Sequence, residues 1–293
     1  MKTLAAIAFV LLFALAAGPG ARAADAPIAI VAAENFYGDV ARQIGGDRVS
    51  VASIMNNPDQ DPHLFETTPG VVRQIAEAQI VILNGANYDP WMDKLIGVTP
   101  RPGRTVIDVA RLTGKKAGDN PHLWYEPATM PAAAKALADA LAAADPAHKG
   151  DYGARLQTFL ASLKAVDDKI AAMRAKFAGM PVTASEPVFG YMAQALGLTM
   201  RNERFQLSIM NDTEPSARDV AAFENDLKAR KVRVMFFNKQ ASDKAVERLV
   251  DLARKSRIPV VGVTETAPPD LPYQNWMLLE LNDTEKALAG PSS

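Results

Sequence analysis

The sequence predicts an α/β protein of two lobes, each containing a parallel sheet, joined by a single long helix. Short apolar segments of strand length alternate with helical patterns in both halves of the chain. One central segment is helical for about thirty residues, and a length of 293 residues is enough for two cores. We therefore expect a signal peptide at 1–23, an N-terminal α/β lobe at 24–150, a connecting helix at 151–180 and a C-terminal α/β lobe at 181–293.

The first 23 residues have the pattern of a secretory signal peptide. Lys2 precedes an apolar run over 4–17, and a Gly-Pro-Gly break leads to Ala21-Arg22-Ala23, which predicts cleavage before Ala24. The apolar run is too short for a permanent membrane helix, which needs about 20 residues. We expect a mature protein that is soluble in the periplasm.

Cysteine usage and net charge exclude several classes of protein. The chain contains no cysteine, so disulfides, thiolate metal sites and a lipid anchor on an N-terminal cysteine are all excluded. It has 32 basic and 33 acidic residues, and cleavage would remove Lys2 and Arg22, leaving a net charge of about −3. A surface with this charge balance argues against nucleic acid as a partner.

The N-terminal half alternates strands with helices. Apolar runs predict strands at 27–33, 49–55, 79–85 and 105–111, and apolar periodicity predicts helices at 36–46, 69–78 and 130–146. Gly45-Gly46 closes the first helix, Pro69 begins the second, and Asp145-Pro146 ends the third. Strands separated by helices of this length form parallel βαβ units.

The central segment predicts a rigid strut, after which the alternation resumes. Apolar residues recur at helical spacing from Leu156 to Phe177, and a helix over 151–180 would be about 40 Å long. Beyond it, strands are expected at 180–185, 232–238 and 258–265, and helices at 188–198, 216–231, 242–257 and 276–290.

Two of the three histidines share one local pattern. His63 follows Asp61-Pro62 and His122 follows Asn120-Pro121, each in a polar loop of the first lobe. Proline restricts the backbone before each imidazole, and the polar neighbour can accept a hydrogen bond from the ring. Surface loop histidines and a paired metal site both remain open, because the chain has no short-range ligand pair such as HExxH.

Two carboxylates follow strands of the second lobe. Glu186 comes directly after the 180–185 strand, and Glu265 ends the 258–265 strand. Ligands of open α/β sheets bind outside the carboxyl ends of the strands. Either carboxylate could instead cap a helix or lie in solvent, but together they are suited to a site shared with histidines of the first lobe.

Four segments resemble the ligand regions of the solute-binding proteins of manganese and zinc ABC transporters, a family that includes the streptococcal surface-adhesin type. They read DPHLFETTP, NPHLWYEP, ASEPVFGYMAQALGL, and VTET followed by YQNWMLLELND. The resemblance covers the whole mature chain and implies two lobes on a long helix with a metal ion between them. It makes His63 and His122 the nitrogen ligands and Glu186 and Glu265 the oxygen ligands.

The chain departs from the family pattern at several positions. Glu186 stands where zinc-type members commonly have a third histidine and manganese-type members have glutamate, and Glu265 stands where aspartate is usual. The histidine-rich insertion common in zinc-uptake members does not occur between His63 and His122. Asn238 falls where many relatives have glutamate, which could change a contact behind the ligands.

The resemblance implies a periplasmic protein that captures Mn²⁺ or Zn²⁺, with Fe²⁺ as a further candidate, and delivers it as a monomer to an inner-membrane ABC permease and its ATPase. Two imidazoles and two carboxylates can hold zinc tetrahedrally, or with bidentate carboxylates can suit manganese. Oxygen donors make manganese the expected physiological cargo, while the Irving–Williams order predicts strong zinc binding in vitro.

Two other functions use the same residues. A periplasmic zinc-dependent hydrolase would need an open coordination position for water and a general base, and the sequence contains no G-x-S-x-G nucleophile motif. A periplasmic metal chaperone would differ only in the partner that receives the ion. We therefore predict that the protein is not an enzyme and that it acts in ion transport.

Overall fold

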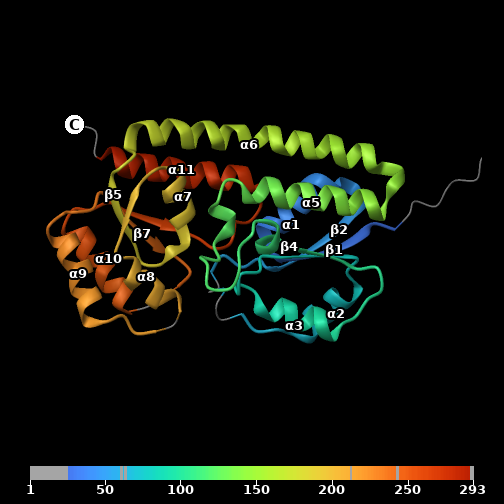
Figure 1. The fold of residues 1–293 in the computed structure, drawn as a ribbon, viewed down its shortest axis with the longest axis horizontal. Helices are drawn as coiled ribbons and strands as arrows, with labels where there is room; N and C mark the ends of the chain where they lie inside the picture. Colours follow the sequence, from blue (N-terminus) through green and yellow to red (C-terminus); the bar gives the residue numbers. More distant parts are fainter. Residues whose placement is uncertain (1–25, 60–61, 63–64, 212, 242–243, 291–293) are drawn as a thin grey trace, which may run out of the picture.

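A computed structural model describes residues 26–59, 62, 65–211, 213–241 and 244–290 of the chain. The expected signal peptide at 1–23, His63 and the expected helix cap Ser242 lie outside the described residues. Figure 1 shows two α/β lobes side by side, with α6 running along both. This arrangement confirms the predicted fold class.

Each lobe contains a four-stranded parallel sheet with the same strand order. The first sheet is ordered β2-β1-β3-β4 and the second β6-β5-β7-β8. The strands are β1 (Ile28–Glu34), β2 (Val49–Met55), β3 (Ile80–Leu83), β4 (Thr105–Asp108), β5 (Pro181–Ala184), β6 (Thr199–Arg201), β7 (Met235–Asn238) and β8 (Val260–Val263). In both sheets the strand order reverses between the first and third strands of the lobe, which is where open α/β sheets bind ligands.

The helices cover the faces of these sheets. In the first lobe they are α1 (Asn35–Gly45), α2 (Pro69–Glu77), α3 (Pro90–Val98), α4 (Val109–Leu112) and α5 (Thr129–Ala144). In the second they are α7 (Gly190–Ala195), α8 (Glu203–Met210), α9 (Ala217–Lys228) and α10 (Lys244–Lys255). All four side chains of β3 are buried, as expected for a central strand with both faces covered.

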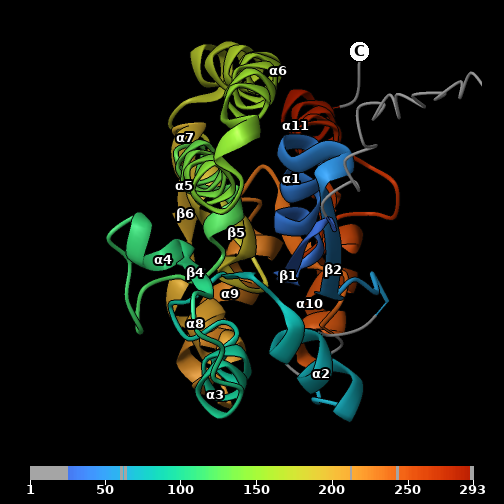
Figure 2. The same cartoon turned by 90° about the vertical axis from the view of Figure 1, so that its right-hand side faces the viewer.

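The predicted long helix connects the lobes, and the last described helix packs along it. Helix α6 (Lys149–Phe177) buries a stripe of apolar side chains that includes Phe159, Val166 and Met173. Helix α11 (Tyr273–Ala289) follows the last strand and lies beside α6 in both views (Figures 1 and 2). The chain thus runs back alongside α6, and the packing of α11 stabilises this long helix.

An ion-pair cluster joins these two helices at their surface. Lys169 Nζ lies 2.5 Å and Lys176 Nζ 3.0 Å from the carboxylate of Glu285, and these ammonium groups lower the pKa of Glu285. We expect Glu285→Gln to reduce the free energy of unfolding at pH 7 by less than about 1 kcal/mol, because the cluster is partly exposed. Urea unfolding measures this loss, which should shrink in high salt, and Asp283→Asn on the same helix is the control. If the loss of unfolding free energy in Glu285→Gln is the same in high salt, the ion pairs are not its cause.

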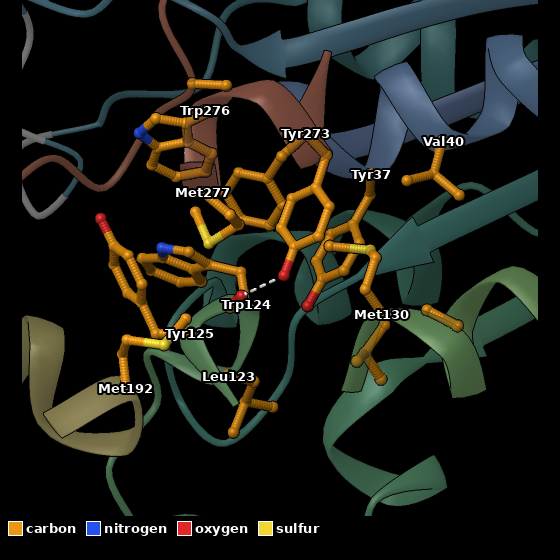
Figure 3. Close-up of a cluster of buried hydrophobic side chains, with 14 of the residues drawn as sticks. Tyr37, Val40, Leu123, Trp124, Tyr125, Met130, Met192, Tyr273, Trp276 and Met277 are labelled. Atoms are coloured by element: carbon orange, nitrogen blue, oxygen red, sulfur yellow. Dashed lines mark hydrogen bonds between the residues drawn. The ribbon is translucent and has the colours of Figure 1, made fainter. Parts of the chain in front are cut away.

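The apolar core continues from one lobe into the other. One buried cluster contains Ile30 and Ile82 of the first sheet together with Phe236 of the second and Leu281 of α11. Its centre is aromatic (Figure 3): Trp124 and Trp276 are fully buried, and the Tyr273 hydroxyl donates to the Trp124 carbonyl at 2.6 Å. A shared core of this kind resists separation of the lobes.

Hydrogen bonds fasten the return segment to the first lobe. Asn35 donates to the Ala267 carbonyl at 2.7 Å and accepts from the Ala267 amide at 2.9 Å, and the Tyr273 amide donates to Asp39 at 2.8 Å. Among the described residues, no helix is long and apolar enough to cross a bilayer.

Candidate metal centre

Three of the four predicted ligands meet where the lobes join. His122 comes from a first-lobe loop just before the 3-10 turn Leu123–Tyr125. Glu186 and Glu265 each lie two residues beyond a strand, β5 and β8 respectively. All three are buried, with 0 %, 3 % and 0 % of their surface exposed. His63 lies outside the described residues, so its place as a ligand stays a prediction.

The loop that carries His122 is fixed from both lobes. Asn120 Oδ1 lies 2.6 Å from His122 Nδ1, and Asn120 Nδ2 donates to the Pro187 carbonyl at 2.8 Å. Because the carboxamide nitrogen faces that carbonyl, its oxygen must accept, and His122 Nδ1 therefore carries a hydrogen. This leaves Nε2 as the atom that can bind a metal ion.

Nε2 of His122 faces a carboxylate across the lobe interface. It lies 3.4 Å from Oε2 of Glu265 and makes no hydrogen bond within the described part of the chain. Two lone-pair donors at this distance in a buried site are stabilised by a cation that both can contact. His122 and Glu265 are thus a candidate ligand pair with one member from each lobe.

A glutamine sets the backbone of the Glu265 loop. Oε1 of Gln240 accepts from the backbone amides of Glu265 and Thr266 at 2.6 and 3.1 Å, and its Nε2 donates to the Thr266 hydroxyl at 3.0 Å. Gln240 follows β7, the neighbour of β8 in the sheet. The end of one strand therefore positions the ligand at the end of the next.

Asn238 contacts both carboxylates. Its Nδ2 lies 2.5 Å from Oε1 of Glu265 and 3.4 Å from Oε2 of Glu186. From the sequence, Asn238 is expected to stand where many relatives have glutamate. In the structure, its side chain lies directly behind the candidate ligands Glu186 and Glu265.

The first lobe contributes a network that the sequence did not predict. Asp89 accepts from the backbone amides of Asn84 and Gly85 at 2.7 and 2.8 Å, and Asn84 Nδ2 donates to the Pro121 carbonyl at 2.8 Å. Asn84 therefore links the end of β3 to the loop of His122. The available signal was an asparagine immediately after a fully apolar strand.

Besides Asp89, one further acidic group, Glu34, and a tyrosine, Tyr88, are buried near this network. Burial raises the pKa of Asp89 to about 6, and burial followed by the charge of Asp89 raises the pKa of Glu34 well above its usual range. Burial, with the charge of Glu265 next, raises the pKa of Tyr88, whose ring packs edge-on against His122. Burial thus disfavours the charged forms of both Glu34 and Tyr88.

A second buried carboxyl joins α11 to the first lobe. Glu280 accepts from Trp276 Nε1 at 2.9 Å and lies 2.6 Å from the Tyr125 hydroxyl, which also lies 2.8 Å from the Thr264 carbonyl. Burial raises the pKa of Glu280 to about 7. The Tyr125 hydroxyl has one hydrogen to donate, and both the Glu280 carboxyl and the Thr264 carbonyl lie within its reach as acceptors.

The shape of the centre suits a small ion. No group of three histidine, aspartate or glutamate side chains in the described ranges could hold a metal ion by itself, and the two predicted ligands whose donor atoms face each other are His122 and Glu265. A groove of about 600 Å³ lies elsewhere, between Asp39 and Arg42 of α1 and the 267–272 segment. None of the predicted ligands is among its lining residues, so this groove is separate from the candidate centre.

Two α/β lobes with a small, buried and polar centre between them define a solute-binding protein. The chain belongs to the ZnuA family, described as zinc-uptake complex component A, periplasmic, whose model matches residues 30–287. It is 25 % identical to the manganese ABC transporter substrate-binding lipoprotein PsaA of Streptococcus mitis, over 97 % of this chain and 96 % of that protein. It is 26 % identical to the zinc-binding protein TroA of Treponema pallidum, over 82 % and 79 % respectively.

Solved structures have the same fold. The periplasmic zinc-binding protein TroA of Treponema pallidum superposes with a TM-score of 0.75 at 19 % identity, covering 88 % of this chain and 98 % of that one. A ZnuA crystal structure gives a TM-score of 0.72 at 22 % identity, covering 91 % and 100 %. The family resemblance predicted from the four segments is thereby confirmed.

Proposed function

We propose that this protein is a periplasmic solute-binding protein that captures a divalent transition metal ion between its lobes and delivers it to an ABC permease with its ATPase. The names of its relatives support transport of manganese, zinc or iron. One observation carries the proposal: His122 Nε2 and Glu265 Oε2 are buried, come from different lobes and face each other at 3.4 Å.

The proposed ligands are His63, His122, Glu186 and Glu265. His122 and Glu265 are supported by their geometry, Glu186 by its burial next to Asn238, and His63 by its sequence pattern alone. We further propose cleavage after residue 23, lobes at 24–150 and 181–293, and a connecting segment at 151–180, most of which is helix α6. The mature protein is then a monomer in the periplasm without a lipid anchor.

Capture would involve local ordering rather than wide opening of the lobes. The apolar core is continuous across the interface, and α6 and α11 both connect the lobes. A metal ion bound by both lobes favours the arrangement that the permease recognises. Release then requires only that the ligand loops loosen at the permease.

The alternative of a zinc-dependent hydrolase has weaker support. Four protein ligands leave little room for a reactive water, and the family consists of transport components. We propose that the protein is not an enzyme. A metal chaperone would use the same site and differ in its partner, so genes for a permease and an ATPase beside this one would favour transport.

Elemental analysis tests the proposed function. Protein purified from the periplasm without added metal should contain close to one equivalent of manganese, zinc or iron, because His122, Glu186 and Glu265 are buried and would release the ion slowly. The His63→Ala/Glu186→Ala double variant should lose this metal. Wild-type protein that carries no metal, and that no added metal stabilises against heat, would overturn the proposal.

A further inference from the structure

Asn238 is the last residue of β7, and its carboxamide has a single orientation. Its Oδ1 accepts from the Gln240 backbone amide at 3.0 Å, and a backbone N–H can only donate. The Nδ2 group must therefore face the opposite side, toward the two carboxylates. The Asn238 amide itself donates to the Ser185 hydroxyl at 3.2 Å, and Asn238 is 2 % exposed, so the residue is fixed in place.

The two hydrogens of Nδ2 point at one oxygen of each glutamate. Oε1 of Glu265 lies at 2.5 Å and Oε2 of Glu186 at 3.4 Å. An oxygen that accepts a hydrogen bond from a fixed donor is a weaker metal ligand. If the carboxylate rotated so that both of its oxygens contacted the metal ion, the hydrogen bond from Asn238 would break. In Glu265, the other oxygen, Oε2, is the one that faces His122.

The number of oxygens that each carboxylate can offer decides which ion fits. Zinc is satisfied by four ligands in a tetrahedron, whereas manganese prefers more oxygen donors in a higher-coordinate site. This inference rests on the proposed function: we propose that Asn238 is a positioning residue that restricts Glu186 and Glu265 to one metal-binding oxygen each and so favours zinc over manganese. The specific cargo would then be zinc, although both ligands are glutamates.

Removal of the carboxamide tests this inference. Competition with a chelator should give the affinities of wild-type protein, Asn238→Ala and Asn238→Asp for zinc and for manganese. We expect the ratio of zinc to manganese affinity to fall by about tenfold or more in both variants, the size typical for loss of a group behind a ligand. Asn238→Asp fills the same space as asparagine, so an effect common to both variants comes from the lost N–H donors and not from a cavity.

The visible spectrum of bound Co²⁺ provides a readout that a general loss of stability would not change. Tetrahedral Co²⁺ absorbs strongly, and higher-coordinate Co²⁺ absorbs weakly. We expect the strong spectrum in wild-type protein and in the exposed control Asn225→Ala, and the weak one in both Asn238 variants. If both Asn238 variants fold and keep the wild-type ratio of zinc to manganese affinity and the wild-type Co²⁺ spectrum, the role of Asn238 is wrong but the proposed function stands. Wild-type protein that binds none of these ions would overturn the proposed function and this inference together.

Discussion

His122→Ala should reduce the affinity for zinc or manganese by more than about 100-fold. Loss of a residue behind a metal ligand can already cost roughly 100-fold, and loss of a ligand itself should cost more. His122 supplies a nitrogen lone pair from the first lobe, and Asn120 directs Nε2 toward Glu265. Without the imidazole, the second lobe would bind the ion alone. Isothermal titration calorimetry with each ion measures the loss, and the metal-induced rise in unfolding temperature should disappear with it.

His148→Ala is the matched control for this variant. His148 lies in the turn Pro146–His148 and pairs with Asp145 at 2.7 Å, well outside the candidate centre. It should retain the wild-type affinity and the wild-type thermal stabilisation by metal. If His122→Ala also retained them, His122 would not be a ligand, and the site would have to be sought elsewhere.

Glu280→Gln should stabilise the metal-free protein by about 3 kcal/mol above pH 7 and leave its stability nearly unchanged below pH 4.5. The pKa of Glu280 rises from its ordinary value of 4.5 to about 7 because the carboxyl is buried. Glutamine imitates the neutral acid in size and shape. Its oxygen can accept from Trp276, and its nitrogen can donate to the Tyr125 hydroxyl once that hydroxyl turns its hydrogen to the Thr264 carbonyl, 2.8 Å away.

The direction of the pH effect follows from the raised pKa. In the wild type, the favourable contribution of a neutral Glu280 is fully present below pH 4.5 and is lost as the pH rises to about 7, since the unfolded chain ionises more readily. Urea unfolding of both proteins at pH 4, 6 and 8, in the presence of a chelator, measures this difference. The exposed Glu247→Gln is the control. Equal stabilities at pH 8 would show that Glu280 is ionised in the folded protein at no cost.

The sequence by itself determined the type and order of most elements. Apolar runs predicted β2 at its observed bounds, Val49–Met55, and the periodicity of 151–180 predicted a helix that the structure places at Lys149–Phe177. These predictions succeed because side-chain periodicity is a local property. The four ligand segments also predicted a centre shared by His122, Glu186 and Glu265, on the ground that strand ends of parallel sheets meet at one edge, and their role as ligands stays a prediction.

Elements that depend on their surroundings were not predicted. Strand β6 (Thr199–Arg201) is three residues long, and α8 (Glu203–Met210) follows it directly with Asn202 in a left-handed conformation (φ 60°). The end of the predicted 105–111 strand is instead the start of α4, capped by Asp108. Segments this short carry too little periodicity, so tertiary contacts decide their structure.

The meeting of groups that are distant along the chain depends on tertiary packing. The return of α11 beside α6, the Glu280–Tyr125–Thr264 chain and the double contact of Asn238 join residues that are 16 to 155 positions apart. Nothing in the local sequence near Asn238 indicates which oxygens it contacts. The sequence determined which chemical groups are available to a metal ion, and the packing of the two lobes determined which of their lone pairs face each other, because burial leaves each polar group only the partners that the fold brings to it.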